Sequence, residues 1–123
     1  MKTLFVIPLI ALAALAFASG PATAPAAAAT ACQGQFDLLR TETEAVVITA
    51  GKVEKERAGL LKLVEDAEAL AAQGKTSDAI TKLLDFEVKV NQLEAAGRIS
   101  LESAAQLLGD AEATIACLQS STA

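Results

Sequence analysis

The chain has 123 residues, 15 of them acidic and 10 basic, with a formal charge of −5. This length supports one small domain, and the acidic balance excludes a nucleic-acid partner and attachment to anionic lipid, which both require a basic surface. Because histidine is absent and there are only two cysteines, the composition also argues against a zinc site.

The N-terminal residues predict a secretory signal peptide over 1–18. Lys2 precedes an apolar run over 4–17, and small residues follow, as at a signal cleavage site. The run is about 14 residues long, whereas a membrane-spanning helix needs roughly 20. Cleavage as late as residue 31 is also compatible with the sequence. We expect a secreted protein, extracellular or periplasmic, with no membrane span after cleavage and an Ala/Pro/Thr-rich disordered segment over 19–33.

Four stretches of helical periodicity follow, over about 34–50, 53–72, 76–96 and 100–119, and 120–123 is predicted as a disordered tail. Apolar residues recur every three or four positions, so each stretch presents one face to a core. Glycines close the first three stretches, Thr76-Ser77-Asp78 offers caps to the third, and Ser100 caps the fourth. The expected core anchors are Phe36, Leu60, Leu83, Phe86, Val90, Leu93, Leu108 and Ile115.

An internal repeat relates the two halves of this domain. Residues 50–58 (AGKVEKERA) recur as residues 96–104 (AGRISLESA), and each copy lies between two helical stretches. A single helix across the first copy would be about 60 Å long, too long for its partners to cover. The sequence therefore predicts an all-α, up-down-up-down four-helix bundle built from two repeated helical hairpins.

Two cysteines flank the predicted bundle. With an even number of antiparallel helices both chain ends meet at one end, so Cys32 and Cys117 are expected to form a disulfide that ties the termini. Two alternatives remain open from the sequence. The cysteines could form a redox pair, although no C-x-x-C motif supports this. Ala29-Thr30-Ala31-Cys32 loosely matches a lipoprotein box, in which Cys32 would be lipidated.

The pattern Leu83-x-x-Phe86-x-x-x-Val90-x-x-Leu93-x-x-x-Gly97-Arg98-Ile99-Ser100 resembles the FIMAH domain. The resemblance covers about residues 38–118 within a predicted domain of residues 34–119. Glu87 and Val88 replace an Ile-Asn pair of the family, and Leu63 stands where a lysine is expected. The resemblance implies a small helical accessory module of secreted bacterial proteins, often appended to exported enzymes. The resemblance implies no catalytic residues for this chain. For the family, attachment to a surface or to a polysaccharide is an expectation.

Catalytic and metal chemistry find little support in the sequence. Carboxylates gather at Glu65, Asp66 and Glu68 and again at Asp110 and Glu112, but they fit a solvated face better than a glycosidase pair, which faces across a cleft. There is no loop of the calcium-binding type, and no serine has a histidine partner. The chain is therefore predicted to be no enzyme and to need no cofactor or metal.

The leading expectation is a non-catalytic interaction module that binds an extracellular protein partner or the cell envelope. The alternative is a polysaccharide- or cell-wall-binding module contacting its ligand at the glycine turns Gly51-Lys52 and Gly97-Arg98, where the simpler interpretation is basic residues after a helix cap. A small enzyme is third. Exposed apolar residues would favour a protein partner or a homodimer, and a polar groove beside the turns would favour a glycan. The expected exposed apolar residues are Val47, Leu61, Val88 and Leu107.

Overall fold

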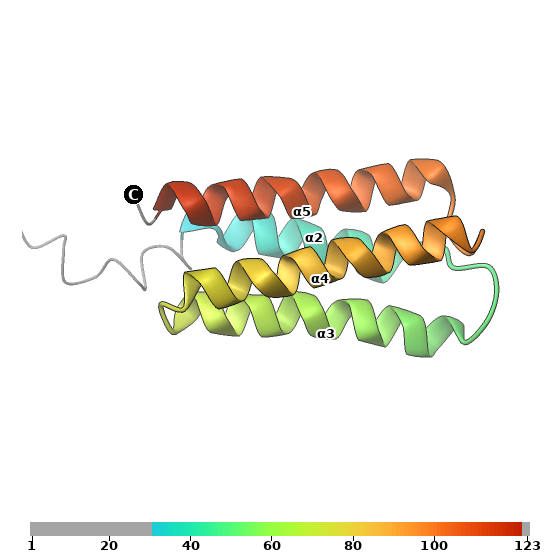
Figure 1. The fold of residues 1–123 in the computed structure, drawn as a ribbon, viewed down its shortest axis with the longest axis horizontal. Helices are drawn as coiled ribbons and strands as arrows, with labels where there is room; N and C mark the ends of the chain where they lie inside the picture. Colours follow the sequence, from blue (N-terminus) through green and yellow to red (C-terminus); the bar gives the residue numbers. More distant parts are fainter. Residues whose placement is uncertain (1–30, 122–123) are drawn as a thin grey trace, which may run out of the picture.

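The computed structural model describes residues 31–121, which form four α-helices and no strands (Figure 1). The helices are α2 (Gln33–Ala45), α3 (Val53–Ala72), α4 (Thr76–Ala95) and α5 (Leu101–Ser121). The prediction of an all-helical domain with four helices is confirmed. The predicted signal peptide over 1–18, most of the segment over 19–33 and the last two residues lie outside the described residues.

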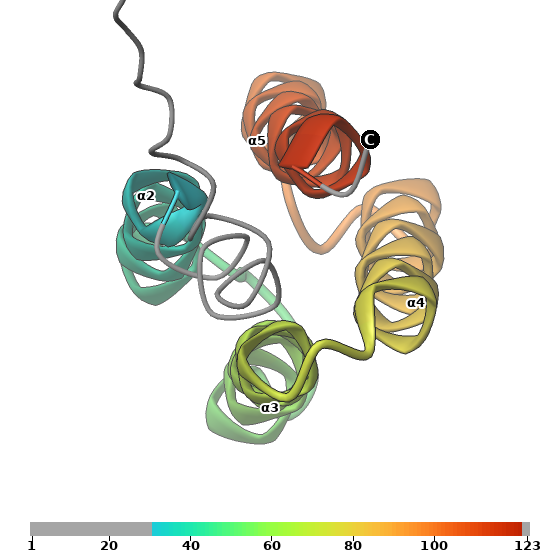
Figure 2. The same ribbon diagram turned by 90° about the vertical axis from the view of Figure 1, so that its left-hand side faces the viewer.

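The four helices lie side by side along the longest axis of the domain (Figure 1). Each helix packs against two others, α2 against α3 and α5, and α4 against α3 and α5. Viewed from its end, the domain shows the helices placed around a common centre (Figure 2). Helices that are amphipathic on one stripe each bury that stripe in such an arrangement.

The expected core anchors on α2, α3 and α4 are all buried, and the exception lies on α5. Of the expected anchors, Leu108 alone is only half-buried, whereas its neighbour Leu107 is 1% exposed. The expectation that Leu107 is exposed is therefore wrong. Leu107 shares a face with Ala104 and Ala111, three and four residues away, while Leu108 lies about 100° further round the helix. The fully buried side chains of largest volume are Phe36, Phe86, Leu39, Leu60, Leu83, Leu107 and Leu118.

Helix α2 ends at Ala45, five residues before the predicted end at Ala50. From Val46 onward the backbone is no longer helical, beginning with φ −63° and ψ 137° at Val46. Four consecutive β-branched residues occupy 46–49, and such residues lose side-chain freedom in a helix. Val46 and Ile48 are buried and Val47 is exposed, the alternation of an extended segment. Arg57 Nη2 donates to the Val46 carbonyl at 2.8 Å.

The glycine-containing turns at Gly74 and Gly97 close α3 and α4 as predicted. Gly74 has φ 79° and Gly97 has φ 74°, the left-handed conformation of a residue just past a helix. Arg98 N–H then donates to the Leu93 carbonyl at 2.8 Å. Ser100 caps α5, since its Oγ accepts from Ser103 N–H at 3.0 Å. The expected cap at Thr76-Ser77-Asp78 is not made, because these residues lie inside α4 and no side chain caps its start.

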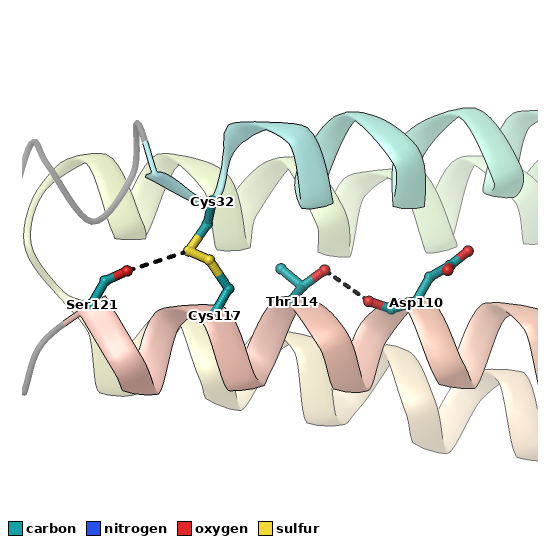
Figure 3. The surroundings of a disulfide bond; sticks show 5 residues. All are labelled: Cys32, Asp110, Thr114, Cys117 and Ser121. Carbon is teal, nitrogen blue, oxygen red and sulfur yellow. Dashed lines mark hydrogen bonds between the residues drawn. A yellow bond between two sulfur atoms is a disulfide. The ribbon is translucent and has the colours of Figure 1, made fainter.

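Cys32 and Cys117 form the predicted disulfide (Figure 3). Their Cα atoms are 5.8 Å apart across a sequence separation of 85 residues. Cys32 precedes α2 and is fully buried, and Cys117 lies near the end of α5 and packs against the core. Figure 3 also shows Ser121 Oγ 3.7 Å from Cys32 Sγ. The bridge therefore joins the beginning and the end of the described helical domain.

Candidate functional site

The two repeat copies meet at one end of the domain. Thr49 N–H donates to the Arg98 carbonyl at 2.8 Å, and Thr49 Oγ1 to the same oxygen at 3.2 Å. Gly51 has φ 77°, and a Cβ added there would lie 2.8 Å from Arg98 Cζ. The backbone conformation therefore favours glycine at position 51, and a Cβ there would also displace the Arg98 guanidinium. A Cβ at Gly97 would meet only open space, and Lys52 is exposed.

Glu56 holds two cations beside this turn. Its Oε1 accepts from Lys89 Nζ and its Oε2 from Arg98 Nη1, each at 2.7 Å. The hydrogen bond from Lys89, together with the charge of both cations, lowers the pKa of Glu56. These contacts connect α3, α4 and the turn before α5, so they fix Arg98 against Gly51.

A hollow of about 250 Å³ opens beside this ion cluster. Among the side chains that line the hollow, Gln92 supplies an amide, and the others are charged or apolar. The hollow lacks an aromatic wall, and its two cations already share one carboxylate. Glu56, Lys89 and Gln92 were not expected there. Glu56 is 42 positions from Arg98 in the sequence, and no local pattern relates the two. The hollow is lined by Glu56, Lys89, Gln92, Leu93, Ala96 and Arg98.

A second, smaller hollow of about 100 Å³ lies between the end of α2 and the start of α5. Val47 borders it and is 67% exposed. Asp110 lies one helical turn beyond Gln106 on α5. Burial and the charge of Glu42 raise the pKa of Asp110. The lining residues are Glu42, Ala45, Val46, Val47, Ser103, Gln106 and Leu107.

The carboxylates singled out from the sequence do not form one site. Glu68 is half-buried and pairs with Arg40 of α2, and its other oxygen accepts from Gln33 at 2.7 Å. Asp66 pairs with Lys62 on its own helix at 3.3 Å. Glu65 is exposed. Glu68 therefore ties α3 to α2, which the expectation of a wholly solvated face did not include.

Glu112 faces a carboxyl that the sequence did not single out as a site residue, Glu87 of α4. Burial, a hydrogen bond with Glu112 and the charge of Glu112 raise the pKa of Glu87 to about 7. Glu87 Oε2 is buried without a hydrogen-bond partner. Two carboxyls this close do not both ionise readily, so a shared proton or an external cation stabilises the pair. The α4–α5 interface thus holds an acidic pair whose ionised form is under-compensated.

Five large apolar side chains remain outside the core and are 45–71% exposed. Val47 and Val88 are among them, as expected, whereas Leu61 is half-buried. The most exposed is Leu101, at the start of α5. Single exposed apolar residues are ordinary, but neighbours on one face indicate a contact surface. The five are Leu38, Val47, Leu84, Val88 and Leu101.

Within residues 31–121, no group of three or more His, Cys, Asp or Glu side chains is placed to hold a metal ion. None of the helices in this part of the chain is both long and apolar enough to cross a membrane. No family model, no curated protein and no solved structure matches the chain.

Proposed function

We propose that the chain is a secreted, non-catalytic interaction module that binds a protein partner through a helical face. In this proposal its fold is an up-down-up-down four-helix bundle of two repeated hairpins, similar to the FIMAH domain. Its termini are tied by a disulfide, a bond typical of exported proteins. The observation that carries the proposal is the set of apolar side chains left on the outer surface of a domain whose core is already filled.

These exposed side chains are not needed to complete the core. Phe36, Phe86 and their neighbours already exclude solvent completely at the centre, so the domain gains nothing in folding from exposed Leu84, Val88 or Leu101. Exposing neighbouring apolar groups favours association with another apolar surface. A helical face of this kind recognises a protein segment through side chains spaced along one stripe.

Cross-linking of the mature protein in the fluid that surrounds its producing cell tests the proposal. We expect one or a few discrete adducts that excess unlabelled protein competes away. A variant carrying Val88→Ser should lose an adduct that the control Ser120→Ala, at an exposed polar site, retains. Absence of any competable adduct would contradict a protein-binding function. N-terminal sequencing of the secreted chain would at the same time test export and locate the cleavage site.

A second candidate is supported by the hollow beside the glycine turns. Gln92 and Lys89 are among the residues that line this space of about 250 Å³, and hydrogen-bonding groups around such a space suit an envelope polysaccharide. A pelleting assay with insoluble polysaccharides and cell walls tests this. Saturable co-sedimentation that weakens on Gln92→Ala and Lys52→Ala, but not on Gln73→Ala at the opposite end, would favour it.

A further inference from the structure

The acidic pair and the exposed apolar residues of α4 and α5 form one continuous surface. Leu84 and Val88 are one helical turn apart, and Glu87 lies between them, so all three flank the same side of α4. On α5, Leu101, Leu108 and Glu112 repeat at intervals of seven and four and share one stripe. Helices α4 and α5 pack together, and the carboxyls of Glu87 and Glu112 are close enough to interact, which joins the two stripes. We name this surface the α4–α5 face: Leu84, Glu87, Val88, Leu101, Leu108 and Glu112.

No positive side chain belongs to this face. Helix α5 contains no lysine or arginine. On α4, Lys89 turns to the opposite flank, where its Nζ lies 2.7 Å from Glu56 of α3, and Lys82, seven residues earlier, shares that flank. The acidic pair therefore has no compensating cation on the described part of its own chain, and Glu87 Oε2 stays without a donor.

Resting on the proposed protein-binding function, we infer that the α4–α5 face docks a cationic amphipathic segment of the partner. A lysine or arginine of that segment would sit between Glu87 and Glu112, and apolar side chains on either side would cover Leu84, Val88 and Leu108. An ammonium or guanidinium in that position donates to both carboxylates and removes their mutual repulsion. Apolar contacts around it exclude water and strengthen the ion pairs.

The other occupants of such a face match its charge poorly. A second copy of this chain related by two-fold symmetry would place one acidic pair against another surface without lysine or arginine, and like charges in contact disfavour binding. Anionic lipid is repelled for the same reason. A cationic segment is the occupant that gains from both the apolar and the acidic parts of the face.

Fluorescence anisotropy with two labelled peptides of about 14 residues tests this inference. One peptide alternates leucine and lysine with helical spacing, and in the other every lysine is replaced by glutamate. We expect the cationic peptide to bind the full mature protein saturably and the anionic peptide to show no binding. The double variant Glu87→Gln with Glu112→Gln should weaken cationic binding about tenfold. Its fold should persist, because glutamine keeps the shape and removes the repulsion.

Matched variants separate the α4–α5 face from general acidity. Glu44→Gln with Glu65→Gln removes the same charge from exposed positions on α2 and α3 and should change binding less than about twofold. Val88→Ser should weaken binding several-fold, whereas Leu38→Ser, at an exposed apolar site on α2, should not. Equal losses in both charge variants, or equal binding of both peptides, would overturn the inference.

Three further outcomes distinguish this inference from the proposed function. Sedimentation equilibrium that shows a dimer abolished by Val88→Ser would identify a second copy as the occupant and overturn the cationic partner. A competable adduct in culture fluid that survives Glu87→Gln with Glu112→Gln would overturn this face as the docking surface and leave the interaction function standing. If the unmodified protein gives no competable adduct and does not bind the cationic peptide, both the proposed function and this inference would be overturned.

Discussion

Replacing Cys117 with serine should lower the stability of the domain more than any single substitution at an exposed residue. The bridge closes a loop with a sequence separation of 85 residues. On the chain-entropy model, losing the constraint on a loop of that length costs about 4.5 kcal/mol. The free energy of unfolding expected of a domain this size is roughly 5–13 kcal/mol. The variant should therefore stay folded at room temperature but lose a large part of that free energy.

The melting temperature is the practical measurement. Each kcal/mol shifts the midpoint of a domain of this length by about 4–8 °C, so Cys117→Ser should melt roughly 20 °C or more below the unmodified protein. Reductant should produce a similar fall in the unmodified protein and leave the variant unchanged. Ala116→Ser, at the neighbouring exposed position, controls for the hydroxyl itself and should have almost no effect.

Two results would contradict this expectation for Cys117→Ser. Intact mass with and without reductant should differ by two hydrogens and show no dimer; two free thiols in the secreted protein would mean that the bridge between Cys32 and Cys117 is not formed. A midpoint lowered by only a few degrees, with the bridge present in the unmodified protein, would mean that the denatured chain is already compact enough for the loop closure to cost little.

Three other predictions test packing, backbone and charge. Leu107→Ala should destabilise the domain by about 2–5 kcal/mol and Leu108→Ala by about 1 kcal/mol, and urea unfolding that reversed this order would refute the assignment of the α5 stripe. Gly51→Ala should cost more than Gly97→Ala, about 2 against 1 kcal/mol, because only at Gly51 would the new Cβ meet a guanidinium; equal midpoints in urea would contradict this. The raised pKa of Glu87 means that stability present below about pH 4.5 is lost as the pH rises through about 7. Glu87→Gln should therefore raise the free energy of unfolding near pH 8, by at most about 1 kcal/mol because the side chain is partly solvated, and leave it unchanged near pH 4. A melting temperature raised equally at both pH values would show that the carboxyl pair is not the cause.

Local sequence rules predicted most of the helices because each rule acts over only a few residues. Apolar spacing placed the stripe of α4, and Gly74 and Gly97 marked the ends of α3 and α4. On α5 two adjacent leucines satisfied the same spacing, so periodicity alone could not decide which of Leu107 and Leu108 faces inward. That choice depends on how the helix is rotated against α2 and α4, which is a tertiary property.

The candidate sites were predicted less well because they depend on pairs of residues distant in sequence. The turns at Gly51 and Gly97 were singled out, but the contact of Arg98 with Glu56 joins residues 42 positions apart. Glu87 was noticed only as a departure from a family pattern. Its function as one half of an acidic pair follows from the way α4 and α5 pack, which no spacing within either helix reveals.

The internal repeat shows where local propensity overrides the symmetry of the two halves. Before Gly97 the chain reads Gln92-Leu93-Glu94-Ala95, residues that favour a helix, and α4 continues to the turn. Before Gly51 it reads Val46-Val47-Ile48-Thr49, and the helix stops early. The extended segment that results reaches across to the Arg98 carbonyl. Residues of this segment border the smaller hollow and Arg98 borders the larger one, so the four β-branched residues that break the symmetry also shape the end of the domain where both hollows lie.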